Sequence, residues 1–266
     1  MDVSRRTVTS AGVGAAALTA LGAGHGGSED VTFWARDLLT GRRTSRGPGE
    51  TRPVLTLSAG PALGLLLHDD GVPALWRRVR YSRDDLVGSS PVCAWHLQDG
   101  LTVAQLGDAA LRRADATATN LLLTRAGGPA AVTAFCRGLG DDRTRLDRVA
   151  PASRSAAPWD PQDTTTAAAL GRTYGALVLG RVLPPAPRGR LTALLPTSPL
   201  PGDWWLTHTA AVGRYGTGAL VGVARRGRRA VLVAVTVRRG QPATYGSRPA
   251  LARIVTGLLR ELDRSW

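Results

Sequence analysis

The sequence predicts an α+β fold, in which a five-stranded antiparallel sheet is flanked by helices and interrupted by an inserted all-helical domain. Three observations lead to this prediction. Segments with alternating apolar residues lie near both ends of the 266-residue chain, and alternation is typical of half-buried strands. Between them the apolar residues recur with a period of about 3.6, which is typical of helices. Apolar residues are 43% of the chain, enough for a sizeable core in one compound domain or in two closely packed ones.

The strand segments fall into an N-terminal pair and a C-terminal triplet. The N-terminal pair reads as a hairpin that turns at Thr40 and Gly41, and the last two strands of the triplet are joined by an Arg-Gly-rich turn. The five predicted strands are residues 31–39, 42–52, 204–214, 219–225 and 230–237.

The helical segments occupy the middle of the chain and its C-terminal end. The predicted helices begin at residue 61 and continue as 103–113, 116–125, 129–139, 165–179 and 249–264. Asp163 is a candidate N-cap for the helix that begins at residue 165. The Pro-rich segment 184–187 is expected to interrupt the chain before the C-terminal strands. The last helix has one apolar face, formed by Leu251, Ile254, Val255, Leu258, Leu259 and Leu262.

The N-terminus predicts a targeting segment over residues 1–28. Arg5 and Arg6 precede an Ala/Gly-rich, weakly apolar run, which resembles a twin-arginine export signal. This pattern predicts an exported or membrane-associated protein, located at the cytoplasmic face of the membrane if the signal is not used. The alternative is that the run forms the first helix of the fold. The remaining domain is residues 29–266, with its sheet part in 29–57 and 200–266 and its helical part in 58–199.

The charge and the cysteines exclude some classes of function. The formal charge is +14 and all 34 basic residues are Arg, but they are spread along the chain and not gathered on one stripe, so nucleic acid is not an expected partner. Attraction to an anionic membrane is the alternative. Cys93 and Cys136 have no metal-ligand spacing, so neither a metal nor a cofactor is expected. The sequence leaves open whether these two cysteines are paired.

A nearly continuous set of motifs between residues 81 and 180 resembles the class A serine β-lactamases of the penicillin-recognising family. The matching segments are 81–87, 90–92, 100–103, 119–123, 127–129, 139–141, 145–148 and 163–166. The resemblance implies the fold predicted above. It also implies that Arg148 and Asp163 form the ion pair that closes the neck of the loop carrying the general base. A planar guanidinium suits such a fixed neck, and Arg148→Ala is expected to lower the melting temperature.

The resemblance also locates the nucleophile, and the group that should accept its proton is missing. β-Lactam hydrolysis needs a serine, a proton acceptor, a donor for the leaving nitrogen and a base that activates water. Ser58 is placed at the nucleophile, as a vestigial and inactive position, with Pro61 where the family has Lys. An alternative register places Thr56 there. The chain contains no Lys, so neither register supplies the amine.

Three further motifs are altered. The family's Ser-Asp-Asn is Ala114-Asp115-Ala116, in which Asp115 is expected to be a buried structural acceptor; Asn120 is expected to be structural as well. The loop base Glu is replaced by Ala150. Lys-Thr-Gly is replaced by His208-Thr209-Ala210, in which His208 and Thr209 are the residues expected to contact a ligand, although a His near its usual pKa is a weak anion anchor.

Loss of four roles predicts that efficient turnover is absent, because removing members of one catalytic unit costs up to ~10⁶-fold in kcat. The resemblance then implies a catalytically inactive sensor or regulator linked to β-lactamase production or to the cell-wall response. Its ligand would be a β-lactam or a peptidoglycan fragment, with a regulatory protein as a further partner. The Arg-rich, Lys-free composition suggests an actinomycete, where class A-like regulatory proteins are a known type.

Two other functions stay open. The chain could be an enzyme that weakly acylates or hydrolyses β-lactams through Ser58. It could also be a decoy whose cleft is filled by the bulky pair Trp204 and Trp205.

Overall fold

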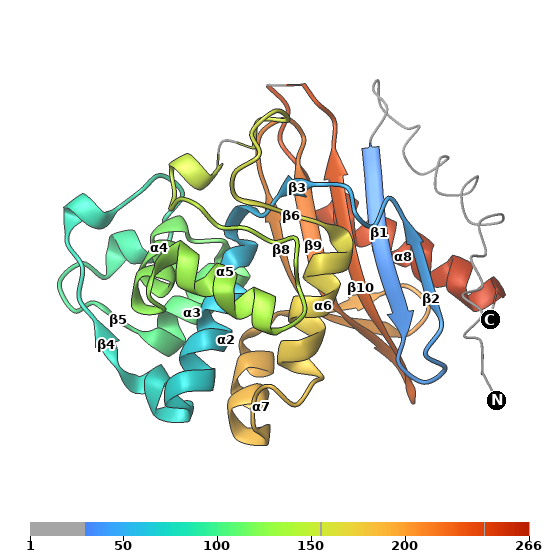
Figure 1. The fold of residues 1–266 in the computed structure, drawn as a ribbon, viewed down its shortest axis with the longest axis horizontal. Coiled ribbons are helices and arrows are strands. Elements are labelled where there is room, and N and C mark those ends of the chain that lie inside the picture. The colour runs from blue at the N-terminus through green and yellow to red at the C-terminus, as the bar shows by residue number, and fades with distance from the viewer. Residues whose placement is uncertain (1–29, 155, 242, 266) are drawn as a thin grey trace, which may run out of the picture.

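Six antiparallel strands form one sheet at the centre of the fold, in the order β2-β1-β10-β9-β8-β7 (Figure 1). The computed structural model describes residues 30–154, 156–241 and 243–265. The strands of the sheet are β1 (Asp30–Asp37), β2 (Arg43–Arg46), β7 (Thr197–Leu200), β8 (Trp204–Val212), β9 (Gly218–Arg226) and β10 (Arg229–Arg238). The α+β class is confirmed, and a strand forms in each of the five predicted segments, although the one predicted over residues 42–52 is only the four residues of β2. The sheet has six strands and not five, because β7 is an additional edge strand.

Two short strand pairs lie outside this sheet. They are β3 (Arg52–Pro53) with β6 (Thr164–Thr165), and β4 (Arg78–Val79) with β5 (Leu101–Thr102). The β3–β6 pair ties the start of the helical part to the end of the loop around residue 150, so it helps to position the candidate site.

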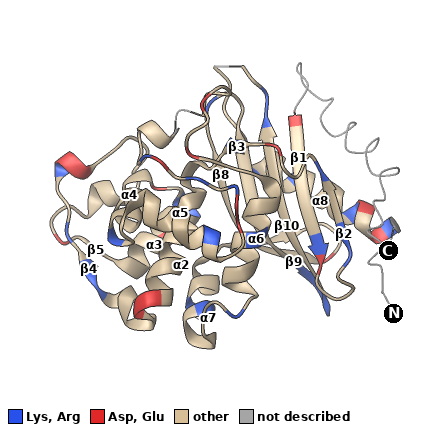
Figure 2. Ribbon diagram, in the orientation of Figure 1, with Lys and Arg blue, Asp and Glu red and all other residues tan. Residues whose placement is uncertain are grey.

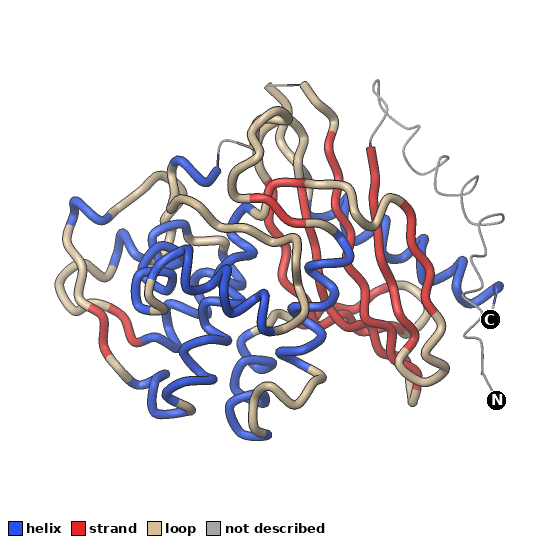
Figure 3. The backbone as a smooth tube through the Cα atoms, in the orientation of Figure 1, coloured by secondary structure: helices blue, strands red, loops and turns tan. Residues whose placement is uncertain are grey.

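Most helices pack together beside one face of the sheet (Figures 1 and 3). They are α2 (Ala59–Asp70), α3 (Val103–Arg113), α4 (Ala116–Arg125), α5 (Gly128–Gly138), α6 (Ala167–Val178) and α7 (Pro185–Leu194). Single 3₁₀ turns are η1 (Leu55–Ser58), η2 (Val72–Trp76), η3 (Arg83–Asp85), η4 (Cys93–Trp95) and η5 (Ala152–Arg154). Because α6 contacts β1, β9 and β10 directly, the helical part and the sheet share one continuous core.

The opposite face of the sheet is covered by α8 (Arg248–Ser265). All six apolar residues predicted for this helix are buried against the sheet. Val31, Phe33 and Ala35 of β1 are buried in the same cluster, while the alternate residues of β1 face α6, as the two-residue period of a strand requires.

Two expectations about the helices are wrong. The Pro-rich segment does not merely interrupt the chain, because α7 begins at Pro185. Proline is tolerated in the first turn of a helix, since an N–H group there would have no partner within the helix. Asp163 does not cap α6. The cap is Thr166, whose side chain accepts a hydrogen bond from the Ala169 N–H at 3.1 Å.

Charged residues are scattered over both parts of the molecule (Figure 2). Among the described residues, no helix is both long and apolar enough to cross a bilayer. The predicted targeting segment, residues 1–28, lies outside the described residues.

Candidate functional site

The segments singled out in the sequence converge on the short 3₁₀ turn η1. This turn contacts β8, α3, α4 and η5, so the chain brings the nucleophile region, the altered Ser-Asp-Asn segment, the loop around Ala150 and the His208 strand to one place. Leu55 at the start of η1 has a φ of +52°, in the left-handed region that an L-residue with a bulky side chain rarely occupies. The backbone is therefore strained at the centre of the candidate site.

Ser58 and Thr56 occupy different environments on this turn. The Ser58 side chain is 4% exposed, and its hydroxyl donates to the Leu55 carbonyl at 3.4 Å. It stands at the N-cap position of α2 but makes no capping hydrogen bond. Thr56 is 8% exposed, and its hydroxyl has no hydrogen-bond partner among the described residues. Of these two hydroxyls, that of Thr56 is the one left available to a ligand.

Asp115 has the structural role that the sequence predicted. Its side chain is fully buried. One carboxylate oxygen accepts from the N–H groups of Val92 and Cys93 at 2.8 and 3.0 Å, and the other accepts from the Ala118 N–H at 2.9 Å at the start of α4. Through these contacts with backbone donors, Asp115 fixes the loop before α3 and caps α4.

Asn120 holds the residue that replaces the general base. Its amide Nδ2 donates to the Ala150 carbonyl at 2.8 Å, and its Oδ1 accepts from the Ala150 N–H at 2.9 Å. The peptide bond between Ala150 and Pro151 is cis. Ala150 is 6% exposed, so a tightly positioned backbone presents a methyl group where the chemistry needs a carboxylate.

The neck of this loop is closed by Arg148 and Asp163, as the resemblance implied. The Arg148 Nε lies 2.6 Å from the Asp163 carboxylate, and Nη2 lies 2.7 Å from Asp160. The guanidinium of Arg148 is thus shared between two acids. The Asp163 carboxylate is 1% exposed and also accepts from the N–H groups of Asp147 and Arg148 at 2.8 and 2.9 Å. These contacts raise the pKa of Arg148, chiefly through its hydrogen bond to Asp160.

His208 and Thr209 lie side by side on β8 but face different surroundings. The Thr209 hydroxyl donates to the Leu111 carbonyl of α3 at 3.2 Å and is buried, so it is already engaged. The His208 ring lies 3.2 Å from the Leu206 carbonyl. Burial lowers the pKa of His208 below its usual 6.5, and the nearby Arg248 lowers it further. His208 is therefore neutral at pH 7 and is a weaker anion anchor than the sequence suggested.

Arg248 is the residue that the sequence reasoning missed. It begins α8, its Nη1 donates to the Arg112 carbonyl at the end of α3 at 3.1 Å, and burial lowers its pKa. A cation at a helix N-terminus opposes the helix dipole. An Arg at the first position of the final helix was therefore the available signal. Arg248 supplies the permanent positive charge that His208 does not.

The tryptophan pair does not occlude the candidate site. Trp204 is 2% exposed in the core between the sheet and α8, with the Arg226 guanidinium 4.6 Å from the ring centre. Trp205 is 55% exposed. The hypothesis that the two indoles occlude the site is wrong.

The two cysteines lie outside the candidate chemistry. Cys93 and Cys136 are free and buried, and burial raises the pKa of each thiol to about 12. Both are thiols rather than thiolates at neutral pH, and so poor nucleophiles. In the part of the chain that the structure describes, no cluster of His, Cys, Asp or Glu could hold a metal ion.

Comparisons with known proteins agree with this architecture. Residues 15–200 match the sequence profile of the β-lactamase enzyme family. A β-lactamase of Streptomyces fradiae is 42% identical over 226 residues, which cover 79% of this chain and 74% of that protein. A β-lactamase of Streptomyces lavendulae is 37% identical over 243 residues, covering 85% and 79%.

Solved structures give the same result. The β-lactamase from Burkholderia vietnamiensis has a TM-score of 0.85 and 31% identity, covering 98% of this chain and all of that one. The class A β-lactamase of the last common ancestor of Gram-negative bacteria has a TM-score of 0.83 and 36% identity, covering 92% and 97%.

Proposed function

This chain belongs to the β-lactamase enzyme family, with a class A fold, and we propose that it is a member that recognises its ligand without hydrolysing it. The ligand class is a β-lactam or a peptidoglycan fragment, and the bound state acts as a sensor or regulator of β-lactamase production or of the cell-wall response. The relatives named above are β-lactamases by name, which supports recognition of the same class of molecule here.

The observation that carries this proposal is Ala150. Asn120 holds its backbone through two hydrogen bonds, and Arg148 and Asp163 close the loop around it. The frame that would position a general base is complete, while the side chain within it has no group that can take a proton. Without that base an acyl-enzyme has no activated water to clear it.

The remaining groups favour binding over turnover. No Lys exists in the chain to accept the nucleophile's proton. His208, with its lowered pKa, is neutral at pH 7, but Arg248 places a cation beside it. A guanidinium recognises a carboxylate through paired N–H donors. Arg248 is the residue on which an anionic ligand would depend most.

Three measurements on the purified protein test the proposal. Nitrocefin turnover at pH 7 is expected to stay at the rate without protein. Benzylpenicillin and soluble muropeptides are expected to raise the melting temperature, because a ligand that binds only the folded state stabilises it. Arg248→Gln is expected to abolish that shift, whereas Arg253→Gln, an exposed Arg on the same helix, should retain it. Catalytic turnover, or a shift equal in both variants, would contradict the proposal.

A second candidate function is slow acylation without release. The hydroxyl of Thr56 has no partner among the described residues, and relatives are named β-lactamases. Peptide mapping by mass spectrometry after incubation with benzylpenicillin distinguishes the two functions. A covalent adduct on Thr56 or Ser58 would establish acylation and identify the register, while an unmodified protein that still shows the thermal shift supports recognition alone.

A further inference from the structure

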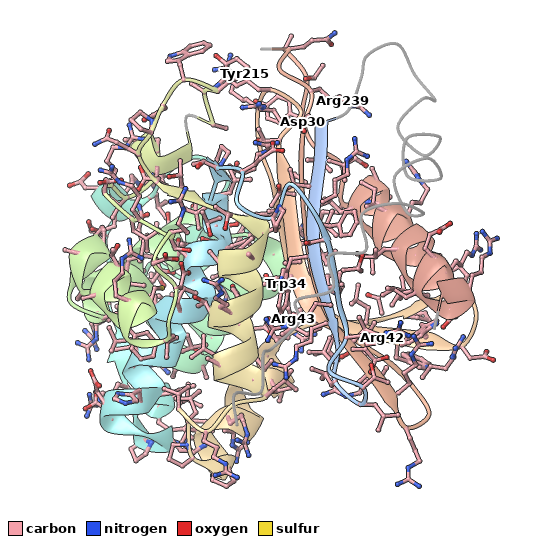
Figure 4. All side chains as sticks on the ribbon, turned by 45° about the vertical axis from the view of Figure 1, so that its right-hand side comes forward. Asp30, Trp34, Arg42, Arg43, Tyr215 and Arg239 are labelled. Carbon is pink, nitrogen blue, oxygen red and sulfur yellow. The ribbon has the colours of Figure 1, made fainter. Side chains whose placement is uncertain are left out.

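A cavity lies between α6 and the β1–β2 hairpin. Its volume is about 410 Å³, within the range of small-molecule sites. Figure 4 shows Trp34 and Arg43 between α6 and the hairpin, while Arg42 projects away from this region. The cavity is distinct from the candidate site, which is formed by η1, β8 and the loop around Ala150.

One wall of the cavity is aromatic and apolar. Trp34 packs directly on Gly171 of α6, where an added Cβ would come within 2.4 Å of the indole. A Cβ added at Gly175 would likewise come within 2.7 Å of the Leu232 side chain. The two glycines therefore let α6 approach the sheet closely and leave a half-buried indole on the cavity wall.

The cavity's charge is of one sign. Arg36, Arg43 and Arg172 line it, and none of the other described residues that line it is acidic. Arg36 and Arg43 are direct partners across β1 and β2, and like charges at directly opposed positions destabilise a strand pair. Their side chains have no hydrogen bond or ion pair among the described residues. Only Arg172 has an acidic neighbour, the exposed Asp142 at 3.5 Å.

We propose that this cavity binds a small aromatic anion, whose phosphate or carboxylate lies between Arg36 and Arg43 and whose ring lies against Trp34. An anion there relieves the repulsion between the two guanidinium groups and satisfies their donors, and both phosphate and carboxylate match the guanidinium fork. The indole supplies a flat apolar surface for the ring. The proposal is independent of the ligand and the function proposed for the candidate site.

Isothermal titration calorimetry with three probes tests each part of this site. 1-Naphthyl phosphate and 1-naphthoate carry the two candidate anions on one ring system, and 1-naphthol carries a neutral hydroxyl. We expect at least one of the two anions to bind, and the tighter one identifies the preferred group. Arg43→Gln is expected to weaken that binding by about 10-fold or more, the effect of losing a charged hydrogen bond.

Arg46→Gln is the matched control. It removes the same charge from the same strand, but Arg46 does not line the cavity, so binding is expected to change by less than about 2-fold. Equal weakening by both substitutions would show diffuse attraction to a basic surface and would overturn the proposal. Naphthol binding as tight as the anions, or no binding by any probe, would overturn it too.

Thermal unfolding without any probe provides a second readout. Because Arg36 and Arg43 repel each other, Arg43→Gln is expected to raise the melting temperature by about 1–3 °C. A structural role for Arg43 predicts the opposite sign. A lowered melting temperature would therefore contradict the proposal even if the variant still folds.

Discussion

The loop that carries Ala150 and the reactive positions around it differ in what they have kept. The loop's frame has its full set of contacts, in which Arg148 pairs with Asp163 and Asp160, and Asn120 holds Ala150. The reactive positions hold Ala114 and Ala150, whose methyl groups cannot exchange a proton, and His208, whose lowered pKa makes it a weak anion anchor. The difference shows that the frame of this site is built by residues other than those at the reactive positions.

The frame is expected to be most sensitive at Asp163. Asp163→Ala removes one of the two acidic partners of Arg148 and leaves two backbone N–H groups without the carboxylate that accepts from them, at a side chain that is 1% exposed. The loss should be about 3–5 kcal/mol in the free energy of unfolding, as for other buried pairs broken on one side. Urea unfolding measures it. Arg148→Ala should cost less, because its side chain is 27% exposed.

Asp142→Ala is the control for that measurement. Asp142 is 74% exposed, and its ion pair with Arg172 is long, at 3.5 Å. Its removal should therefore change the free energy of unfolding by less than about 0.5 kcal/mol. A loss at Asp163 no greater than at Asp142 would show that the neck does not stabilise the fold.

Restoring the base should weaken the protein without restoring activity. Ala150→Glu places a carboxylate at a position that is 6% exposed, which should cost about 1–3 kcal/mol because burying a charged group carries a desolvation penalty. Nitrocefin turnover should remain at background, since the proton acceptor and shuttle are still missing. Val149→Glu at the neighbouring residue, which is 39% exposed, should be close to neutral in stability. Measurable hydrolysis by Ala150→Glu would show that a base is the only missing part.

A substitution at Asn120 tests whether the loop depends on the side chain that holds the Ala150 backbone. Asn120→Ala removes both hydrogen bonds to the Ala150 backbone and should reduce the free energy of unfolding by about 1–2 kcal/mol. Thr124→Ala, at an exposed position of the same helix, should have little effect. Limited proteolysis should cut the loop around residue 150 faster in the Asn120 variant than in the Thr124 variant, and equal rates would argue against a positioning role.

The sequence predicted those features that depend on local pattern. Alternation located β1, β8, β9 and β10, and the 3.6-residue period predicted the bounds of α3 and α4 as the structure has them. α7 was missed because proline usually breaks helices, although in a first turn it is tolerated. β7 was missed because four residues are too few to show alternation, and its pairing with β8 depends on long-range contact.

The candidate site was predicted in its motifs but not in its electrostatics. Asp115, Asn120 and Arg148 occur within recognisable segments, so their structural roles could be inferred. Arg248 could not be placed, because it lies 40 residues beyond His208 in the chain and approaches it only when α8 packs on the sheet. The environments of Ser58 and Thr56 likewise depend on the strained turn at Leu55. No residue pattern in the sequence predicts that turn.

The smallest expected effect concerns the charge of His208. Its pKa in the folded protein is lowered by burial and by Arg248, so the folded state binds this proton less readily than the unfolded state, whose pKa is about 6.5. At pH 7.5 both states are neutral there and stability is unaffected. As the pH falls through 6.5 the unfolded state takes up the proton first, and the folded protein loses stability. His208→Gln removes this loss, so its melting temperature should fall less than that of the wild type between pH 7.5 and pH 5.5. If the melting temperatures of the two proteins fall equally over that range, the imidazole is as well solvated as in the unfolded chain. His208 could then carry a positive charge and act as an anion anchor.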